Sequence, residues 1–385
     1  MTNNFDENDM YSVNRITINT AALRHNYRLV AANLPAGVRL LAMVKGDGYG
    51  HGMVEAARAF AEAGCGVFGV AELCEGIQLR KSGVEGDIFV MVGFQPEHAE
   101  LFFTFNLVPV VFSREAVQAL SETAVRLQRK IGVHLKIDCG MSRLGVLPGE
   151  IEEFTDLILA LPGISLAGVL SHFPEADNPR SPGTARAFAI YSEALSRIEN
   201  RFSGLRHIAN SGAVLNFPET LCNMVRAGIA LYGYSPDGIR ENSRVGDSYL
   251  RPAMTFATRI AMVKEVPPGT GISYGRTYIT TRQTRLAVLP VGYEDGYPRA
   301  LSSVAEVLIH GHRAPILGRV CMNLCMADIT EIEGVRAGDE AVLLGEQGGE
   351  VITADDIAAW AGTISYEILC MLGNNNERVH VEYDS

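Results

Sequence analysis

The stretch 39-RLLAMVKGDGYGHGMVEAARAFAEAG-64 contains a strand-like run, a glycine-rich turn and a helix-like segment. Residues 39–45 are mostly apolar, which is typical of a strand that a sheet covers on both faces, yet this strand ends on Lys45. Lysine is costly to bury. Three of the next five residues are glycine and free the backbone there. The stretch therefore predicts a parallel βα unit with an unusual lysine where its strand ends.

The same alternation of strand and helix continues to about residue 245. Two of the helical segments, 113–130 and 184–202, repeat apolar residues at helical spacing and open on Ser or Thr caps. Strands are predicted at residues 39–45, 65–71, 87–93, 107–112, 132–138, 164–172, 205–210 and 224–233. About eight such units predict a closed α/β (β/α)8 TIM barrel, with a doubly wound open sheet as the competing arrangement.

Beyond residue 245 short strands separated by turns replace the alternating pattern. Strand-like segments lie at 253–266, 285–292, 304–320 and 340–346, and a helical pattern returns only at 353–362. We therefore expect three parts. They are a polar N-terminal tail over 1–12, the barrel over 13–245 and a mostly-β C-terminal domain over 246–385.

Composition excludes several classes of partner. Hydrophobic residues make up 47% of the 385 residues, enough for a large core, and the formal net charge of −11 argues against a nucleic-acid surface. No run of about 18 apolar residues predicts a membrane span, and the acidic first residues lack the features of a secretory signal. These features predict a protein without nucleic-acid or membrane partners.

The seven cysteines argue for a reducing, cytoplasmic location. Their number is odd and no CxxC pair occurs, which argues against a disulfide framework. Cys321 and Cys325 are spaced like half of a metal site, but no second pair stands at ligand spacing. We therefore expect small buried side chains there and no metal.

Polar side chains recur where the predicted strands end or within the eighth strand. They are Lys45, Lys136, Asp138, His172, Asn210, Ser211 and Arg226. Taken singly, His172 reads as a satisfied core histidine, Lys136 as a snorkelling side chain and Arg226 as the partner of a carboxylate. Because the carboxyl ends of barrel strands build a single site, the shared location favours a functional site.

Lys45 has the clearest chemical implication. A lysine in a poorly solvated cavity has a lowered pKa and becomes a nucleophile, which suits a Schiff base with an aldehyde. The glycines beyond it allow close approach of a flat cofactor or of backbone to a phosphate. Residues 226-RAGIALYG-233 could supply backbone N–H groups to a phosphate from Gly228 onward, a recurrent arrangement late in a barrel.

The segment VKGDGYGHG resembles the lysine motif of the alanine racemases, a family whose barrel binds pyridoxal 5'-phosphate. Eight further segments resemble the family in the same order along the chain. They are HLKIDCGMSRLG at 134–145, HFPEAD at 172–177, HIANS at 207–211, VRAGIALYG at 225–233, ISYGRTY at 272–278, VGYEDGYPR at 291–299, GRVCMN at 318–323 and TISYEI at 363–368. Their common order makes the resemblance more specific than any periodicity.

The resemblance implies a racemase with two bases. Lys45 would hold the cofactor as a Schiff base and act as one base, and Tyr274 would act as the other on the opposite face. His172, in contact with Arg226, would favour the phenolate of Tyr274. Arg226 would donate to the pyridine nitrogen without giving up its proton, which limits the electron sink and suppresses transamination.

The resemblance also implies the binding residues. The cofactor would contact Lys45, Tyr49, Arg143, His172, Ser211, Arg226, Gly228, Ile229 and Tyr366, and the substrate would contact Arg143, Met322 and Tyr297. Lys136 matches a lysine that carries a carbamate in several relatives. His207 matches a neighbour of the pyridine-facing arginine, and Asp177 and Arg319 match residues along the substrate channel. Tyr274, Tyr297 and Met322 would come from a partner subunit, which implies a homodimer with shared active sites.

The sequence departs from the family pattern at several positions. Gly46 and Gly48 replace alanine, Ala227 replaces proline, Cys139 replaces threonine, Glu294 replaces alanine and Asn323 replaces aspartate. The segment 376-NERVHVEY-383 lacks the usual proline and arginine. Substrate preference is therefore less firmly implied than the type of reaction.

The leading hypothesis is an alanine racemase that supplies D-alanine for peptidoglycan. The alternatives are a racemase of broader specificity, for example for serine, and a pyridoxal-phosphate carrier, which would have no use for a C-terminal domain bearing Tyr274 and Tyr366. Decarboxylases of this architecture use a cysteine and an acidic pyridine partner in place of Tyr274 and Arg226. A cofactor-free Schiff-base aldolase would not need the phosphate-binding residues.

Overall fold

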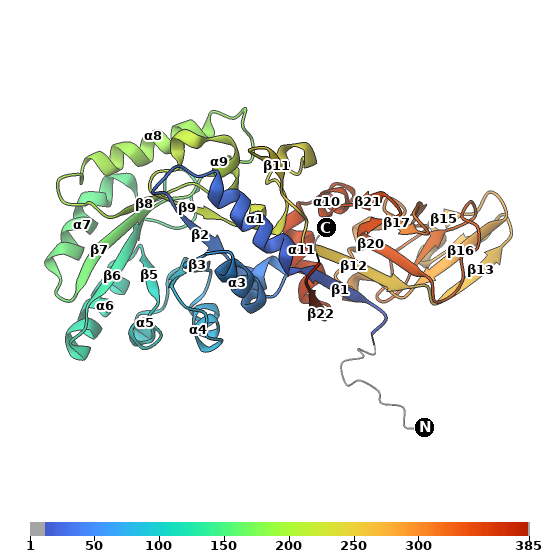
Figure 1. Ribbon diagram of the computed structural model, residues 1–385, viewed down its shortest axis with the longest axis horizontal. Helices are drawn as coiled ribbons and strands as arrows, with labels where there is room; N and C mark the ends of the chain where they lie inside the picture. The colour runs from blue at the N-terminus through green and yellow to red at the C-terminus, as the bar shows by residue number, and fades with distance from the viewer. Residues whose placement is uncertain (1–11, 384–385) are drawn as a thin grey trace, which may run out of the picture. The chain divides into compact units, whose positions relative to one another are not determined.

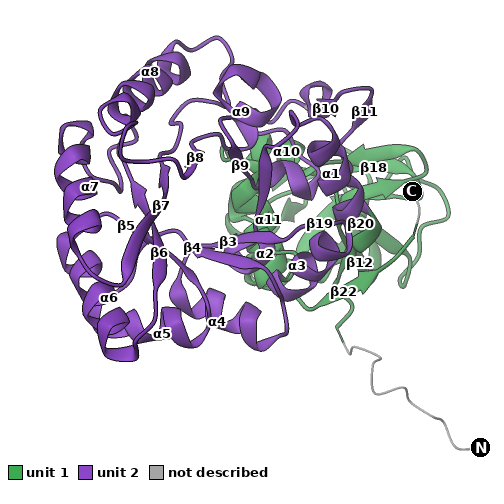
Figure 2. Ribbon diagram, turned by 60° about the vertical axis from the view of Figure 1, so that its left-hand side comes forward, with its two compact units in different colours: residues 1–21, 49–52, 252–385 green, residues 22–48, 53–251 purple. Residues whose placement is uncertain are grey.

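The structure, a computed structural model, describes residues 12–383. It divides into two compact units, which Figure 2 draws in different colours. The barrel unit comprises residues 22–48 and 53–251, and the β unit comprises residues 1–21, 49–52 and 252–385. The predicted polar tail over 1–12 lies, apart from its last residue, outside the described residues.

The barrel unit contains eight parallel strands in a nearly closed barrel, as the sequence predicted (Figure 1). The strands are β2 (Arg39–Met43), β3 (Val67–Val70), β4 (Asp87–Val90), β5 (Val108–Val111), β6 (Ile131–Lys136), β7 (Ile164–Leu170), β8 (Leu205–His207) and β9 (Met224–Ala227). Their order is β8-β7-β6-β5-β4-β3-β2-β9. The eighth strand is shorter than predicted, because residues from Ile229 to Tyr232 form a 3-10 helix and not an extension of β9.

The helices of the barrel unit run round the outside of the strands (Figure 2). They are α1 (Thr20–Ala32), α3 (Met53–Glu62), α4 (Leu73–Lys81), α5 (Ala99–Thr104), α6 (Arg114–Leu127), α7 (Ile151–Ala160), α8 (Gly183–Ser196) and α9 (Ser211–Asn216). The predicted cap of α6 is confirmed, since the Ser113 hydroxyl accepts the N–H of Ala116 at 3.3 Å. The predicted Thr cap of α8 is wrong. Pro182, whose φ of −73° already suits a helix start, takes the N-cap position, and Thr184 lies inside the helix.

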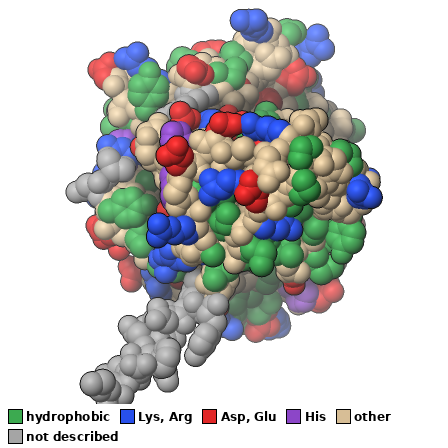
Figure 3. Space-filling model, turned by 90° about the vertical axis from the view of Figure 1, so that its right-hand side faces the viewer, with side chains coloured by type: hydrophobic (Ala, Val, Ile, Leu, Met, Phe, Trp, Pro, Cys, Tyr) green, Lys and Arg blue, Asp and Glu red, His purple; other side chains and the backbone are tan. Residues whose placement is uncertain are grey.

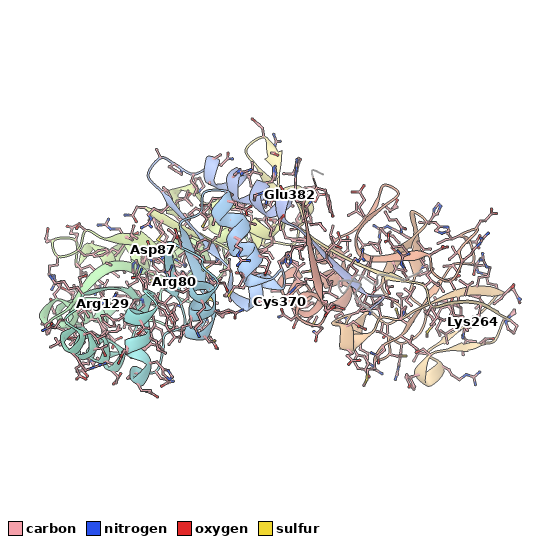
Figure 4. The ribbon with its side chains drawn as sticks, turned by 60° about the horizontal axis from the view of Figure 1, so that its bottom comes forward. Arg80, Asp87, Arg129, Lys264, Cys370 and Glu382 are labelled. Carbon is pink, nitrogen blue, oxygen red and sulfur yellow. The ribbon has the colours of Figure 1, made fainter. Side chains whose placement is uncertain are left out.

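Arg80 ties together the loops that lead into two barrel strands. This residue of α4, labelled in Figure 4, donates hydrogen bonds of 2.8–3.0 Å to the carbonyls of Val84, Gly86, Phe105 and Asn106. Val84 and Gly86 precede β4, and Phe105 and Asn106 precede β5. One guanidinium thus satisfies four backbone acceptors that the loops would otherwise leave to water.

The β unit is mostly β, as predicted, and is built on two main sheets. The larger has seven strands, β1 (Arg15–Asn19), β12 (Met254–Arg259), β17 (Glu306–Ile309), β18 (His312–Pro315), β20 (Glu340–Gln347), β21 (Glu350–Ile352) and β22 (Arg378–Val381). The smaller has β13 (Met262–Val266), β16 (Thr284–Leu289) and β19 (Cys325–Asp328). Two helices follow, α10 (Ala354–Ala361), whose N-cap Thr353 accepts the N–H of Asp356 through its side chain, and α11 (Ser365–Asn374).

Two features of the β unit differ from the sequence prediction. The expected strand over 253–266 is two strands, β12 and β13, which belong to different sheets. Strand β1, which the predicted boundaries assigned to the barrel, lies between antiparallel β12 and parallel β22. Its backbone pairing is therefore with segments more than 200 residues away in sequence, which no local pattern could reveal.

The C-terminal segment is docked although it lacks the family's proline and arginine. Strand β22 pairs with β1 from Ile16 to Asn19. The side-chain amide of Asn376 also donates to the carbonyl of Asp295 at 2.8 Å. Backbone pairing with β1 and the hydrogen bond of Asn376 thus hold this segment without the family's proline and arginine.

The residues after β2 form a left-handed turn. Gly46, Asp47 and Gly48 have φ of 62°, 51° and 65° with ψ near 41–50°, and Tyr49 has φ 53°. The N–H of Gly48 donates to the carbonyl of Val44 at 2.9 Å, which closes the turn. Both glycines that depart from the family's alanine therefore lie where a Cβ is unfavourable.

Replacing Gly48 with alanine should lower the free energy of unfolding by about 1–2 kcal/mol. The added Cβ would lie 3.2 Å from the Met53 nitrogen and 3.4 Å from the Ala56 Cβ, in a residue with φ of +65°. Urea-induced unfolding followed by circular dichroism measures the loss. Gly149→Ala is the control, because it has no left-handed φ and nothing lies within 4 Å of its added Cβ. An equal loss in both variants would contradict the strain.

The surface drawn in Figure 3 carries Lys and Arg side chains next to Asp and Glu side chains, with hydrophobic ones between them. Within residues 12–383 no helix is both long and apolar enough to cross a membrane. All seven cysteines lie within the described residues, and none of them forms a disulfide.

Candidate active site

A buried arginine lies at the centre of the barrel unit's polar cluster. Arg226 on β9 is 4% exposed, and its guanidinium donates to the carbonyls of His207, Ser171 and Ile208 at 2.8, 2.6 and 3.3 Å. It also contacts Nδ1 of His207 at 3.0 Å and Nδ1 of His172 at 3.3 Å. Burial lowers the pKa of Arg226 to about 10. Within the described residues no carboxylate forms an ion pair with it, which excludes the alternative interpretation of Arg226 as the partner of a carboxylate.

The histidines beside Arg226 are neutral. Burial, reinforced by the charge of Arg226, lowers the pKa of His207 and of His172 well below the ordinary 6.5. His207 in turn lies 2.9 Å from a third buried histidine, His134, between its Nε2 and the other ring's Nδ1. Burial lowers the pKa of His134 to about 3. The sequence alone indicated no role for His134, although the segment HLKIDCGMSRLG begins on it.

Acidification should destabilise the fold through these three histidines. In the unfolded chain they bind protons near pH 6.5, whereas in the folded chain they stay neutral to much lower pH, about 3 for His134. The unfolded state therefore binds more protons between about pH 6.5 and 3, so stability falls as the pH drops through this window. The slope should reach up to about 1.4 kcal/mol per pH unit for each histidine.

Urea unfolding at pH 7.5, 6.5 and 5.5 measures this slope. His134→Gln should reduce it by the contribution of one proton, because glutamine does not titrate. A slope that is the same with and without His134 would contradict the neutral state of this buried histidine.

Lys136, the last residue of β6, is 7% exposed. Burial, followed by the positive charges of Arg226, Arg143 and Lys45, lowers the pKa of Lys136 to about 8, and Asp138 opposes the shift. A substantial fraction of this amine is therefore neutral near pH 7 to 8. The structure excludes the snorkelling side chain that the residue's position alone suggested.

Lys45 lies at the barrel mouth and not inside the strand. β2 ends at Met43, and Lys45 opens the left-handed turn with its side chain exposed in the single chain. The prediction that Lys45 ends the strand within a poorly solvated cavity is therefore wrong here. The apolar run from Leu40 to Val44 is buried, and the turn carries the next residue outward.

Glu75 holds the turn that carries Lys45, a role that the sequence did not reveal. Its Oε1 accepts the N–H of Gly46 at 2.9 Å. Its Oε2 accepts the N–H groups of Ala71 and Glu72 at 2.7 and 3.0 Å. One carboxylate thus fixes the turn after β2 to the segment after β3. A lone glutamate in a helix carries no sequence signal for this role.

Arg143 lies on a closed loop after β6. The carboxylate of Asp138 accepts the N–H groups of Gly140 and Ser142 at 3.0 Å each. The N–H of Asp138 donates to the carbonyl of Val146 at 2.9 Å, which closes the base of the loop. Asp138, which the sequence placed among the polar strand ends, therefore shapes the loop that presents the exposed Arg143.

Ser211 joins the segments after β8 and β9. Its hydroxyl accepts the N–H of Gly228 at 2.8 Å and that of Ala230 at 3.4 Å. Ser211 is 5% exposed, and Gly228 and Ile229 are buried. The structure thus brings together three of the residues predicted to bind a phosphate. The Gly228 amide is directed at the serine oxygen.

In the β unit, Tyr49 and Tyr366 lie together. Their ring centroids are 6.0 Å apart, at an interplanar angle of 50°. Burial, followed by the neighbouring Tyr366 and Cys370, raises the pKa of the Tyr49 phenol above its ordinary value. Tyr49 therefore carries a neutral hydroxyl at physiological pH.

Tyr274 is the most exposed of the large hydrophobic side chains described, at 72%. It follows Ser273, whose φ is 61° and whose hydroxyl donates to the carbonyl of Arg319 at 2.6 Å. The Ser273 hydroxyl also lies 3.3 Å from Sγ of Cys321, which accounts for that half-buried cysteine without a metal. These contacts fix the segment that presents the Tyr274 phenol.

The remaining substrate candidates differ in exposure. Met322 is 53% exposed, whereas Tyr297 is 0% exposed and its hydroxyl has no partner among the described residues. Burial raises the pKa of Tyr297 well above its ordinary value. Beside Met322, the amide of Asn323 donates to the carboxylate of Glu294. Asn323 replaces the family's aspartate and so lacks its negative charge. Glu294, which accepts the hydrogen bond from Asn323, carries a negative charge at this place instead.

Across residues 12–383 no group of three or more His, Cys, Asp or Glu side chains is arranged to hold a metal ion. Cys325 is fully buried in β19, and burial raises the pKa of its thiol.

Two family descriptions together match most of the chain. Residues 18–236 match the family described as alanine racemase, N-terminal domain, and residues 253–380 match alanine racemase, C-terminal domain. The chain belongs to the alanine racemase family. The resemblance stated from the lysine motif is thereby confirmed, as is the isomerase class to which the family belongs.

Relatives in the family match over nearly their whole length. The alanine racemase of Geobacter sulfurreducens is 43% identical over 371 residues, which are 94% of this chain and 96% of the relative. The crystal structure of the enzyme from Streptomyces lavendulae has a TM-score of 0.91 at 34% identity, covering 97% and 98% of the two chains. The enzyme from Bartonella henselae, solved with covalently bound pyridoxal phosphate, has a TM-score of 0.86 at 26% identity, covering 96% and 99%.

Proposed function

We propose that this chain interconverts L-alanine and D-alanine with pyridoxal 5'-phosphate as its cofactor. The observation that carries the proposal is the buried guanidinium of Arg226, held by carbonyls and neutral histidines, with no carboxylate partner in the described residues. A guanidinium donates a hydrogen bond but keeps its proton. Facing the pyridine nitrogen, it would leave that nitrogen unprotonated, which favours racemisation over transamination.

The residues present fit this cofactor. When bound, pyridoxal phosphate supplies an electron sink that acidifies the Cα proton of the attached amino acid. The exposed amine of Lys45 would bind its aldehyde carbon. Ser211, with the amides of Gly228 and Ile229, and the hydroxyls of Tyr49 and Tyr366 would bind its phosphate. This assignment is supported by the cluster of Ser211 with Gly228 and by the pairing of Tyr49 with Tyr366.

The two proton-transfer groups in the proposal are Lys45 and Tyr274. Inversion requires that one group remove the Cα proton from one face and another return a proton to the opposite face. The amine of Lys45 would act on one face and the phenol of Tyr274 on the other. His172 is neutral and presents its Nδ1 to the guanidinium of Arg226, which leaves its proton on Nε2. It would donate that N–H to the phenol oxygen of Tyr274 and so favour the phenolate.

Lys136 and Arg143 would position the substrate carboxylate. Carbamate formation with carbon dioxide requires a neutral amine, and the lowered pKa of Lys136 supports this modification. The carbamate would replace a buried cation by an anion that pairs with Arg143. Arg143 would then reach the substrate carboxylate and the phenolic oxygen of the cofactor.

A homodimer with shared sites completes the proposal. Tyr274 and Met322 are exposed in the single chain, at 72% and 53%, although both are large side chains usually covered by a partner. In the dimer, these two residues would serve the site of the partner subunit. Tyr297, the third residue predicted to do so, is fully buried in its own chain and presents no surface to a partner. The proposed location is the cytoplasm, supported by seven cysteines that form no disulfide within the described residues, and the proposed use of the D-alanine is peptidoglycan synthesis.

A racemisation assay in deuterated water over a panel of amino acids tests the function. Alanine should be inverted with incorporation of deuterium at Cα, and serine and larger amino acids should react much more slowly. Comparable rates for serine would favour the broader racemase, for which the altered pair Asn323 and Glu294 is the one supporting observation. Cofactor binding without turnover of any amino acid would favour the carrier.

Replacing Arg226 with glutamate should raise the ratio of transamination to racemisation by about tenfold or more. An acidic partner would protonate the pyridine nitrogen and strengthen the electron sink. The pyruvate formed per racemisation event measures the ratio, and a circular-dichroism melt confirms that each variant folds. Arg226→Lys, which keeps a cation, is the matched control. An unchanged ratio in folded Arg226→Glu protein would contradict the assigned role.

A further inference from the structure

His134 reaches His207 across an intervening strand because that strand has a glycine at the crossing point. His134 is on β6, His207 is on β8, and Gly168 of β7 is the register partner of His134. A Cβ on Gly168 would lie only 2.0 Å from Nδ1 of His134 and 2.2 Å from its Cε1. The imidazole of His134 therefore occupies the space that any other residue at 168 would fill.

The two rings are enclosed by protein. His134 is 2% exposed and His207 is 0% exposed. Phe89 on β4 stands edge-on to both, with centroid distances of 4.8 Å to His134 and 6.0 Å to His207 at angles of 78° and 82°. The hydrogen bond between the histidines thus lies where water does not compete, and a missing partner would be costly.

The contacts determine which nitrogen carries each proton. Arg226 can only donate, so Nδ1 of His207, 3.0 Å from its guanidinium, must accept. A neutral imidazole has one N–H, which places the His207 proton on Nε2. That nitrogen lies 2.9 Å from Nδ1 of His134, which must accept in its turn, leaving the His134 proton on Nε2. The hydrogen bonds therefore run in one direction, from Arg226 to His207 to His134.

We propose that His134 is a positioning residue that keeps His207 as an acceptor for Arg226 and so holds the guanidinium in its working orientation. If the His207 ring flipped, a ring carbon would face the guanidinium of Arg226. If Nδ1 carried the proton, its N–H would face the N–H groups of the guanidinium. Neither arrangement forms a hydrogen bond. His134 disfavours both states because its Nδ1 accepts a hydrogen bond from the Nε2–H of His207. The charged groups that act on this pair are Arg226 and, for His134, Arg39, and both oppose a positive imidazole.

The direction of the hydrogen bonds can be read by NMR on the full-length chain labelled with ¹⁵N-histidine. His134→Gln and His207→Gln each remove one set of signals and so assign the rings. Nitrogen shifts should place the proton on Nε2 of both rings at neutral pH. A through-hydrogen-bond coupling should join Nε2 of His207 to Nδ1 of His134. A proton on Nδ1 of either ring, a charged ring at neutral pH or an absent coupling would overturn the proposal.

Three variants separate positioning from core filling. His134→Leu keeps apolar bulk without an acceptor, His134→Gln keeps an acceptor oxygen, and Gly168→Ala retains His134 but fills its space. In Gly168→Ala the coupling should vanish. His134→Leu should lower kcat by about 10- to 100-fold with little change in KM and raise pyruvate formation, and His134→Gln should recover most of kcat. His312→Gln, at an exposed site, is the control.

The kinetic measurements rest on the proposed function, whereas the NMR measurements do not. An inactive chain whose NMR spectra show the expected coupling would support the direction of the hydrogen bonds and count against the proposed function. An active racemase in which His134→Leu and His134→Gln have the same kcat would overturn the positioning role and leave the proposed function intact.

Discussion

Lys45→Ala protein should bind no cofactor covalently and should lose racemisation by a factor of about 10⁴ or more. The effect is large because one amine has two duties in the proposed function. It binds the aldehyde carbon of pyridoxal phosphate, and it transfers a proton on one face of the substrate Cα. No other lysine in the barrel unit's cluster can replace it, since Lys136 is buried at the end of β6.

Reduction with borohydride identifies the attached lysine directly. After reconstitution with pyridoxal phosphate and reduction, mass spectrometry of peptides should find the cofactor on Lys45. Lys264→Ala, at an exposed lysine labelled in Figure 4, is the matched control and should keep both the visible absorption and the activity. Cofactor attached to another lysine, or a wild-type chain that cannot be reconstituted, would refute the assignment.

Tyr274→Phe should reduce racemisation by about 10²- to 10⁴-fold while the cofactor remains attached to Lys45. The substitution removes only the hydroxyl, so a loss of this size would identify a proton-transfer group and not a packing contact. Because Lys45 still serves one face, one enantiomer of alanine should exchange its Cα proton for deuterium without inverting. The other enantiomer should exchange far more slowly.

The exchange of each enantiomer in deuterated water, followed by NMR and chiral chromatography, measures this asymmetry. Tyr249→Phe, at an exposed tyrosine of the barrel unit, should behave as the wild type. If both enantiomers exchange at undiminished rates in Tyr274→Phe, the second base lies elsewhere. If both slow equally, the tyrosine supports the site without dividing the two faces.

The barrel was predictable because its strands are short apolar runs. Each of the eight predicted strands corresponds to a strand in the structure, since a parallel strand buried on both faces must be apolar along its length. Their ends were less predictable. Lys45 continues an apolar run in the sequence, but the left-handed turn from Gly46 to Tyr49 ends the strand earlier and exposes the amine.

Residues that act through long-range contacts carried little or no signal in the sequence. Glu75 appears as an ordinary helical glutamate, yet it holds the turn after Lys45. His134 appears as a histidine within a strand, and its contact with His207 depends on a glycine in the strand between them. Such roles arise from side chains that meet only after the chain has folded.

By itself the sequence determined the alternation of strand and helix, the mostly-β second part and the lysine motif of the racemase family, because local hydrophobic pattern and motif spacing carry that information. Only the tertiary structure decided that β1 joins the sheet of the β unit and that Arg226 pairs with no carboxylate among the described residues. It also decided that two neutral histidines contact Arg226 and that a third, His134, contacts His207. The physical reason is that strand pairing, burial and the resulting pKa shifts depend on residues distant in the chain, which no window of sequence contains.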